Sequence, residues 1–194
     1  QYGSTHTEIK RVGFDIDRKV EMLFDSDTGL GMAKSLGVGI SGMAEAFRDL
    51  DPDIVLVLGD RDEPFAAGVA AAHMQIPVAH IHGGDVMIGA TIDDSLRHAL
   101  TKFAHIHFAV SEQSAERISR LGEEPSRITV SGAPGLDDIL NGEYVPGEDA
   151  CTQLGLDPNR PLILLVQHPV TTQPGAGGEQ MQATVDALED VEAQ

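Results

Sequence analysis

Short apolar runs recur along the chain and are separated by longer segments with a helical pattern. We predict strands over the apolar runs, which are 54–58, 76–81, 105–110, 127–130 and 161–166. We predict helices over the segments between them, at 32–49, 64–74, 93–104 and 112–121. Strands that alternate with helices of about 10 to 15 residues are typical of βαβ units and a parallel sheet. The pattern therefore predicts a doubly wound, Rossmann-like α/β fold, in which the runs IVLVL and LILLV are buried on both faces.

A segment rich in Gly, Pro and acidic residues, 132–160, precedes the last predicted strand. We predict an N-terminal Rossmann-like domain over 1–140, incomplete at its start, an interdomain crossing over 141–160, and the beginning of a second Rossmann-like domain over 161–194. One strand and one helix cannot close a core. We therefore expect the sequence to be an excerpt of a longer protein.

The balance of charge excludes one class of partner. The sequence carries 31 Asp and Glu against 13 Lys and Arg, which gives a formal net charge of −18. A nucleic-acid-binding surface needs a basic stripe to contact phosphates, and these residues cannot supply it. The carboxylates are spread along the chain, a pattern that favours a surface adapted to high salt; equal stability in low and in molar salt would contradict this hypothesis.

The sequence indicates neither a membrane span nor thiolate chemistry. It contains no run of about 18 apolar residues, and its first residues lack the order of a signal peptide. We therefore expect a cytoplasmic protein with no membrane partner. Cys151 is the single cysteine, which excludes a disulfide within one chain and a thiolate metal cage.

Polar residues follow three of the predicted strands, as GDRDE at 59–63, HGGD at 82–85 and QHP at 167–169. Ligands of open α/β sheets bind beyond the carboxyl ends of the strands, where these clusters are expected to meet. A Gly-Asp after a strand is most often a turn with a helix N-cap, so no cluster alone indicates a site. The clusters together favour one, because the next predicted helix presents a polar face formed by Asp94, Arg97 and His98.

A metal site is the first alternative. His80, His82 and Asp85 offer the imidazole and carboxylate groups that suit zinc. No compact third-ligand motif follows them, however. His105 and His107 begin an apolar strand and are expected to pack and to form hydrogen bonds. We therefore favour a site without a metal.

A site for a sugar diphosphate accounts better for the same residues. Gly83 and Gly84 would let the backbone approach a ligand closely. The residues expected to neutralise phosphate are Arg61, Arg97 and His168. Those expected to act as acid, base or hydroxyl acceptor are Asp60, Asp85 and Asp94.

Two further interpretations bear on this site. Arg97 could instead form a salt bridge within its own helix, with Asp93 or Asp94. The glycines of the segment 29–42 do not follow a strand in the spacing of a dinucleotide fingerprint. We therefore expect no nicotinamide cofactor.

At these positions the sequence resembles the UDP-N-acetylglucosamine 2-epimerase family. The resemblance is carried by "DSDTGLGMAKSLGVGI", "LGDRDEPFAAGVAAA", "IPVAHIHGGDV", "IDDSLRHALTKFAHIHF", "ITVSGAPGLDDIL" and "VQHPVTT", which lie in order along the chain. The Gly-Asp-Arg-x-Glu and Asp-Asp-Ser-x-Arg-His forms are similar to those of the hydrolysing branch, which makes N-acetylmannosamine for sialic-acid-type pathways.

The resemblance implies two Rossmann-like domains arranged as in type B glycosyltransferases, with a UDP-sugar bound between them and no cofactor. It implies elimination of UDP from UDP-N-acetylglucosamine through a glucal-like intermediate, followed by hydration to N-acetylmannosamine. We also expect a homo-oligomer, either a dimer or a tetramer. Three alternatives stay open: a UDP-2,4-diacetamido-trideoxy sugar as substrate, a non-hydrolysing epimerase, and a glycosyltransferase or non-catalytic nucleotide-sugar binder.

Carried onto this chain, the resemblance implies four catalytic residues, Asp60, Asp85, Asp94 and His168. It implies substrate-binding roles for Arg61, Glu63, His82, Gly83, Gly84, Arg97 and His98. Position 85 is Asp where the family pattern is expected to have Glu, which leaves open whether His82 or Asp85 fills the catalytic acid position. The family's N-terminal phosphate-contacting turn and most of its C-terminal domain are absent from the sequence, so we expect activity to belong to the full-length protein.

Overall fold

The computed structural model describes residues 6–24, 28–87, 92–168 and 175–194. The chain divides into two compact units, 1–133 and 134–194. This division lies close to the predicted end of the first domain at residue 140. Within the described ranges, no helix is long and apolar enough to span a membrane.

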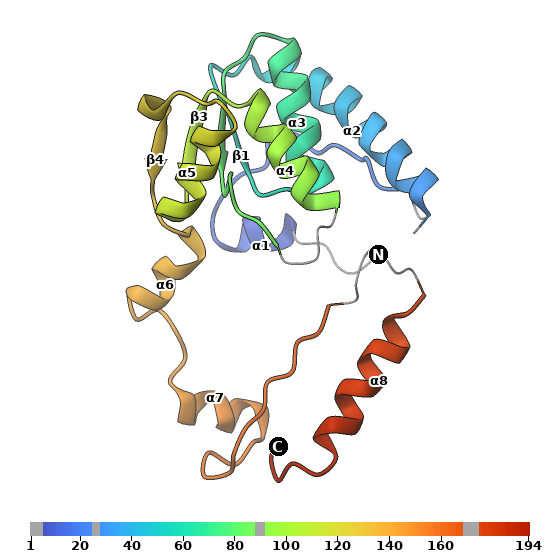
Figure 1. The fold of residues 1–194 in the computed structure, drawn as a ribbon, viewed down its shortest axis with the longest axis vertical. Helices are drawn as coiled ribbons and strands as arrows, with labels where there is room; N and C mark the ends of the chain where they lie inside the picture. The colour runs from blue at the N-terminus through green and yellow to red at the C-terminus, as the bar shows by residue number, and fades with distance from the viewer. Residues whose placement is uncertain (1–5, 25–27, 88–91, 169–174) are drawn as a thin grey trace. The chain divides into compact units, whose positions relative to one another are not determined.

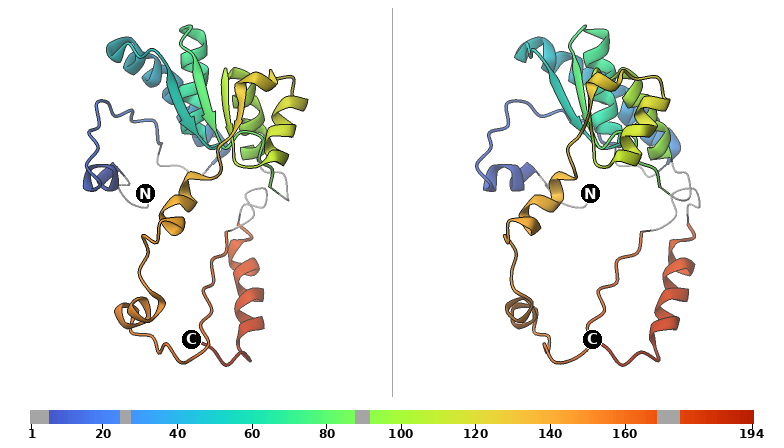
Figure 2. Two further views of the ribbon diagram at one scale, coloured as in Figure 1. Left: turned by 90° about the vertical axis from the view of Figure 1, so that its left-hand side faces the viewer. Right: turned by 60° about the vertical axis from the view of Figure 1, so that its left-hand side comes forward.

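The first unit contains a four-stranded parallel sheet with the strand order β1-β2-β3-β4. Its elements are α1 (His6–Arg11), α2 (Gly29–Leu50), β1 (Val55–Leu58), α3 (Asp62–His73), β2 (Val78–Ile81), α4 (Ile92–Phe103), β3 (Ile106–Ala109), α5 (Glu112–Arg120), η1 (Pro125–Arg127) and β4 (Ile128–Val130). Each of the first three strands is followed by a helix that leads to the next parallel strand (Figures 1 and 2). The predicted alternation of strands and helices and the parallel Rossmann-like sheet are confirmed.

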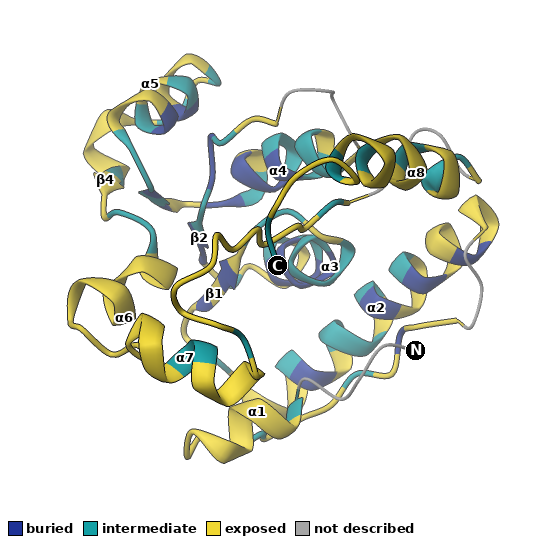
Figure 3. Cartoon of the chain, turned by 90° about the horizontal axis from the view of Figure 1, so that it is seen from below, coloured by how far each residue is buried: buried dark blue, intermediate teal, exposed yellow. Residues whose placement is uncertain are grey.

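The helices cover one face of this sheet. The four strands lie in the sheet in the same order as along the chain. Right-handed crossovers between such strands place α3, α4 and α5 on the same side of the sheet (Figure 3). In β1, Val55 and Val57 are buried, whereas Leu56 and Leu58 on the opposite face are 61% and 57% exposed. The prediction that IVLVL is buried on both faces is therefore wrong for the described chain, because every connection crosses on one side.

Small side chains bring the helices close to the sheet and to each other. Helix α3 buries a row of alanines, among them Ala66, Ala70 and Ala71. A Cβ atom added at Gly68 would lie 2.3 Å from Leu100 Cδ1, so the absence of a side chain there lets α4 pack directly against α3. This close packing fixes the position of α4, which carries three of the candidate site residues.

Two histidines lie side by side in the buried layer of the sheet. His80 of β2 is paired with Val57 of β1 and with His107 of β3, and both rings are fully buried. His80 Nε2 donates to the carbonyl oxygen of Gly59, 2.8 Å away, which requires the proton to lie on Nε2. Burial lowers the pKa of His80 to about 4. Burial also lowers the pKa of His107, although the nearby Glu123 carboxylate opposes this effect.

The second unit contains η2 (Pro134–Leu136), α6 (Asp137–Leu140), α7 (Gly147–Leu154) and α8 (Gly177–Leu188), and none of these helices has a buried residue (Figure 3). The strand predicted over 161–166 does not form, and Leu164 and Val166 there are 86% and 68% exposed. That prediction is wrong for this chain, because an apolar run becomes a strand only where a neighbouring strand accepts its hydrogen bonds. The expectation that these residues cannot close a core is confirmed.

The buried His80 makes the folded chain less stable as the pH is lowered. Its pKa is about 4 in the folded chain and about 6.5 when exposed, so between these values the unfolded chain binds more protons than the folded one. We expect the free energy of unfolding to fall as the pH is lowered from about 6.5 to 4, with a contribution from this group of up to about 3 kcal/mol. Chemical denaturation at several pH values measures this slope, and His80→Gln should reduce it. An unchanged slope in the variant would contradict the assignment.

Candidate functional site

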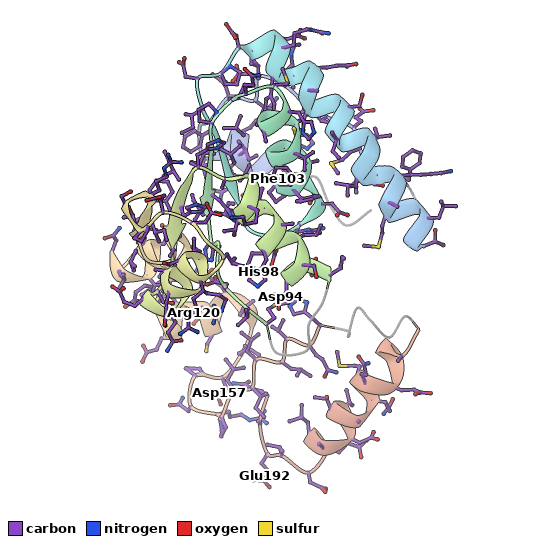
Figure 4. The ribbon with its side chains drawn as sticks, turned by 45° about the horizontal axis from the view of Figure 1, so that its top comes forward. Asp94, His98, Phe103, Arg120, Asp157 and Glu192 are labelled. Carbon is purple, nitrogen blue, oxygen red and sulfur yellow. The ribbon has the colours of Figure 1, made fainter. Side chains whose placement is uncertain are left out.

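Side chains from three strand ends and two helix starts meet at the carboxyl edge of the sheet in the first unit. Asp60 follows β1, and the turn 82–85 follows β2. Helix α4 contributes Asp94, Arg97 and His98 from its first two turns, and Figure 4 labels Asp94 and His98. The predicted convergence of the first two polar clusters with the α4 face is therefore observed.

Arg97 lies at the centre of this group, with its side chain only 8% exposed. Its guanidinium forms a hydrogen-bonded ion pair with the carboxylate of Asp60. Its Nη1 donates to the carbonyl oxygen of His82 at 3.1 Å and lies 3.6 Å from Asp85 Oδ2. The distance from Arg97 Nε to Asp94 Oδ1 is longer, at 4.0 Å. The main partners of Arg97 are thus the ends of β1 and β2, and the interpretation of a salt bridge within the helix accounts for the weakest of its contacts.

Asp85 is held by hydrogen bonds on both carboxylate oxygens. Ser114 Oγ donates to Oδ1 at 2.6 Å, and His82 Nδ1 lies 3.2 Å from Oδ2. Ser114 is itself fixed, because its Oγ lies 2.9 Å from the Oγ of Ser111. Ser111 is the N-cap of α5 and accepts a hydrogen bond from the Ser114 backbone. The start of α5 therefore sets the orientation of the Asp85 carboxylate.

The turn that carries His82 and Asp85 has an uncommon backbone. His82 has a φ of 66°, in the left-handed region that few residues other than glycine adopt. Gly84 has a φ of 77°, and a Cβ atom there would lie 2.2 Å from the backbone oxygen of Ser114. Arg117 of α5 donates to the Gly84 carbonyl. Strained conformations of this kind persist where the surroundings impose them and are concentrated at functional sites.

Asp94 connects the beginning of α4 to the end of the same turn. Both of its carboxylate oxygens accept from the backbone N–H of Met87, at 3.2 and 3.1 Å. One turn further along α4, His98 has a buried Nδ1 without a hydrogen-bond partner in the described part of the chain. An unpaired buried nitrogen of this kind costs free energy unless a ligand or water satisfies it.

Three of the predicted site residues are not brought into this group. The side chains of Arg61 and Glu63 are 77% and 41% exposed and lie 3.6 Å from each other. His168 is an exposed residue of the second unit. Pro169, which completed the third predicted cluster, lies outside the described residues. The roles predicted for Arg61, Glu63 and His168 stay predictions.

The geometry of the histidines differs from that of a metal centre. His80 Nε2 is directed at the Gly59 carbonyl, and His82 Nδ1 at Asp85. Across the described ranges, no three His, Cys, Asp or Glu side chains are placed to hold a metal ion. His107 is buried as expected, but neither of its ring nitrogens has a hydrogen-bond partner within the described residues, so the hydrogen bond expected for it is not observed. The ring of His105 accepts a hydrogen bond from the Val78 N–H at 3.2 Å.

Sequence reasoning missed Ser111, Ser114 and Arg117, which hold the turn from the side of α5. The sequence did contain a signal for them, because Ser111 lies directly after the predicted strand 105–110, at the start of the next helix. The rule that sites form beyond strand ends applies to this strand as it does to the other strands. The candidate site therefore draws on the ends of three consecutive strands.

Comparisons with known proteins show the family of this chain. The family model for UDP-N-acetylglucosamine 2-epimerase matches residues 1–194. A UDP-N,N'-diacetylbacillosamine 2-epimerase (hydrolyzing) from Legionella pneumophila is 38% identical over 186 residues, which are 96% of this chain and 49% of that protein. A GDP/UDP-N,N'-diacetylbacillosamine 2-epimerase (hydrolyzing) from Campylobacter jejuni is 34% identical over 88% of this chain and 44% of that protein. The chain thus spans about half the length of these relatives.

The fold is shared with solved structures as well. The UDP-GlcNAc 2-epimerase from Neisseria meningitidis, solved with UDP-GlcNAc bound, superposes with a TM-score of 0.77 at 19% identity. The match covers 94% of this chain and 51% of that one. Likeness at this level of identity establishes the fold of the matched part of the chain alone.

Gly84→Ala tests the close approach of the turn to α5. We expect a loss of at least about 2 kcal/mol in the free energy of unfolding, because a Cβ atom meets the Ser114 carbonyl and the backbone is left-handed. Gly37→Ala is the matched control, since nothing lies within 4 Å of its added Cβ atom and it sits inside α2. The control should be neutral or stabilising by up to about 1 kcal/mol. Equal effects of the two variants, measured by urea denaturation, would contradict the assigned geometry.

Arg97→Met tests the central cation. The variant leaves the carboxylates of Asp60 and Asp85 without their buried partner, so we expect a loss of about 3 kcal/mol in the free energy of unfolding. Arg120→Met is the control, because Arg120 pairs with Glu116 at the surface, where the side chains are 75% and 62% exposed. The control should change the stability by less than about 0.5 kcal/mol. If both variants behave alike in denaturation, Arg97 does not hold the strand ends together.

Proposed function

We propose that this chain, which belongs to the UDP-N-acetylglucosamine 2-epimerase family, is part of a hydrolysing UDP-sugar 2-epimerase. The observation that carries the proposal is the group formed by Asp60, His82, Asp85 and Asp94 around the buried Arg97. Epimerisation at carbon 2 requires proton transfer at a carbon atom, and carboxylates and imidazole are the side chains that perform it. The carboxyl edge of the sheet is also where open α/β folds bind their ligands.

The proposed reaction has two steps, elimination of UDP and hydration of the resulting double bond. In the first, a base removes the proton from carbon 2, and the electrons of that bond form a carbon 1–carbon 2 double bond as the carbon–oxygen bond to UDP breaks and UDP leaves with its electron pair. In the second, water adds across the double bond, with the hydroxyl on carbon 1 and a proton on carbon 2. The sum is neither an oxidation nor a reduction, so no nicotinamide is required.

The residues divide between the two ends of the substrate. We assign proton transfer and hydroxyl binding to the group around Arg97, since its members meet at the edge of the sheet. We assign the departing diphosphate to Arg61, which is exposed, and to His168 of the second unit. Gly83 and Gly84 are buried, and the space that their side chains would occupy is taken by His80 and by the backbone of Ser114, so their substrate-binding roles stay predictions.

The identity of the sugar on the UDP-sugar substrate is the second part of the proposal. The Legionella and Campylobacter relatives are named for N,N'-diacetylbacillosamine, a sugar with two acetamido groups. Their similarity favours a UDP-diacetamido sugar as the substrate. UDP-N-acetylglucosamine, which gives the family its name, is the second candidate. The expected homo-oligomer and cytoplasmic location stay predictions.

A substrate panel tests this proposal on the full-length protein. We expect incubation with UDP-N,N'-diacetylbacillosamine to release UDP and a free sugar epimerised at carbon 2, and to do so faster than incubation with UDP-N-acetylglucosamine. Separation of the products by chromatography with mass detection identifies both. Recovery of an intact UDP-sugar epimer would instead indicate a non-hydrolysing enzyme, and binding without any conversion would indicate a nucleotide-sugar binder.

Two variants assign the activity to the candidate site. Asp60→Asn should lower kcat by about 100-fold or more, because a group in the reacting cluster is lost. Asp53→Asn is the control, since Asp53 is exposed and precedes the opposite end of β1. The control should keep kcat within about threefold of the unaltered protein. Full activity of both Asp60→Asn and His168→Ala would contradict the proposed site.

A further inference from the structure

The candidate site contains more than one group able to move a proton, and the structure distinguishes them by their hydrogen bonds. The four groups are the carboxylates of Asp60, Asp85 and Asp94 and the imidazole of His82. A base that attacks carbon 2 needs a lone pair directed at the substrate and not already accepting from the protein. The hydrogen bonds of each group therefore decide which one is available.

Each of the three carboxylates is engaged by protein donors. Asp60 is paired with the guanidinium of Arg97. Asp94 accepts from the Met87 N–H through both oxygens. Asp85 accepts from Ser114 on one oxygen and from His82 on the other. Both oxygens of Asp85 and of Asp94 thus accept from the protein, whereas in Asp60 only Oδ2 does so among the described residues.

His82 is engaged through one ring nitrogen only. Its Nδ1 lies 3.2 Å from Asp85 Oδ2, and because a carboxylate only accepts, Nδ1 carries the proton. In the neutral ring the lone pair is then on Nε2, which has no partner among the residues that the structure describes. The side chain is 28% exposed, so this nitrogen is open to a ligand. The backbone of His82 is held in place by its left-handed conformation, with a φ of 66°, and by the hydrogen bond from Arg97 to its carbonyl oxygen.

We propose that His82, and not Asp85, is the group that takes the proton from carbon 2 of the sugar, with Asp85 as the residue that positions its ring. Nε2 of the neutral imidazole accepts the proton and becomes an imidazolium. The electron pair of the broken carbon–hydrogen bond forms the carbon 1–carbon 2 double bond as UDP leaves. Asp85, hydrogen-bonded to Nδ1, balances the new positive charge. This assignment rests on the proposed function and selects one residue within it.

Two variants at position 82 separate the reacting nitrogen from the fold of the turn. In His82→Asn the amide nitrogen occupies the place of Nδ1 and retains the hydrogen bond to Asp85, while Nε2 is removed; asparagine also tolerates a left-handed backbone. In His82→Gly the ring is removed and the backbone conformation is free of strain, which leaves a space for added imidazole. His73→Asn is the control for a histidine-to-asparagine change, because His73 is exposed at the end of α3.

The measurement is the rate at which full-length protein in heavy water releases UDP and incorporates deuterium at carbon 2 of the free sugar, alongside substrate affinity from calorimetry. We expect His82→Asn to lower this rate by about 100-fold or more, with affinity within about threefold of the unaltered protein. Imidazole should restore at least about tenfold to His82→Gly. Asp85→Asn should lower the rate by about tenfold at unchanged affinity, and imidazole should not restore it.

Two results would overturn the assignment. The first is a rate for His82→Asn within about threefold of the unaltered protein together with a loss of about 100-fold in Asp85→Asn, which makes the carboxylate the base. The second is a His82→Gly variant that still binds the UDP-sugar but regains no activity when imidazole is added. Failure of the proposed function looks different, because the unaltered protein would then incorporate no deuterium and release no UDP from any UDP-sugar of the panel.

Discussion

A single buried cation organises the carboxyl edge of the sheet. The guanidinium of Arg97 is almost fully withdrawn from water, and burying its charge is costly unless acceptors meet its donors. Nη1 and Nη2 have such acceptors, whereas the buried Nε has no hydrogen-bond partner within the described residues. The acceptors come from the Asp60 carboxylate and the His82 carbonyl, which follow two neighbouring strands. The planar fork of arginine suits this task, because it reaches two separate acceptors in fixed directions. The cation therefore sets the spacing of the loops that form the candidate site.

The position of Arg97 depends in turn on features of the core that have no chemical function. Helix α4 lies close to α3 because Gly68 has no side chain in front of Leu100. His80 occupies the sheet layer below α4 as a neutral ring, so it adds no second positive charge near Arg97. A cationic His80 would repel the guanidinium of Arg97. The buried histidine and the buried arginine are compatible because only one of them is charged.

The sequence predicts much of this arrangement, and the remainder has physical reasons. Helices and strands of the first unit lie within a few residues of their predicted bounds, because alternating apolar runs and amphipathic segments are local signals. The meeting of Asp60 with the 82–85 turn follows from parallel strands that end at one edge. Helical spacing places Arg97 beside Asp94, but the choice of Asp60 as partner depends on how deeply α4 packs, which no local pattern encodes. The run 161–166 reads as a strand and is not one, since strand formation depends on a neighbour.

The contact between the 82–85 turn and the start of α5 has a consequence for how this sequence can change over time. The backbone oxygen of Ser114 excludes any side chain at position 84, its hydroxyl needs an acceptor at position 85, and Arg117 needs the carbonyl of Gly84. The restriction at position 84 comes from a main-chain atom and therefore persists whatever side chain stands at 114, whereas the Ser114–Asp85 hydrogen bond depends on both side chains. These two positions are about 30 residues apart in the sequence, yet their contributions to stability are coupled.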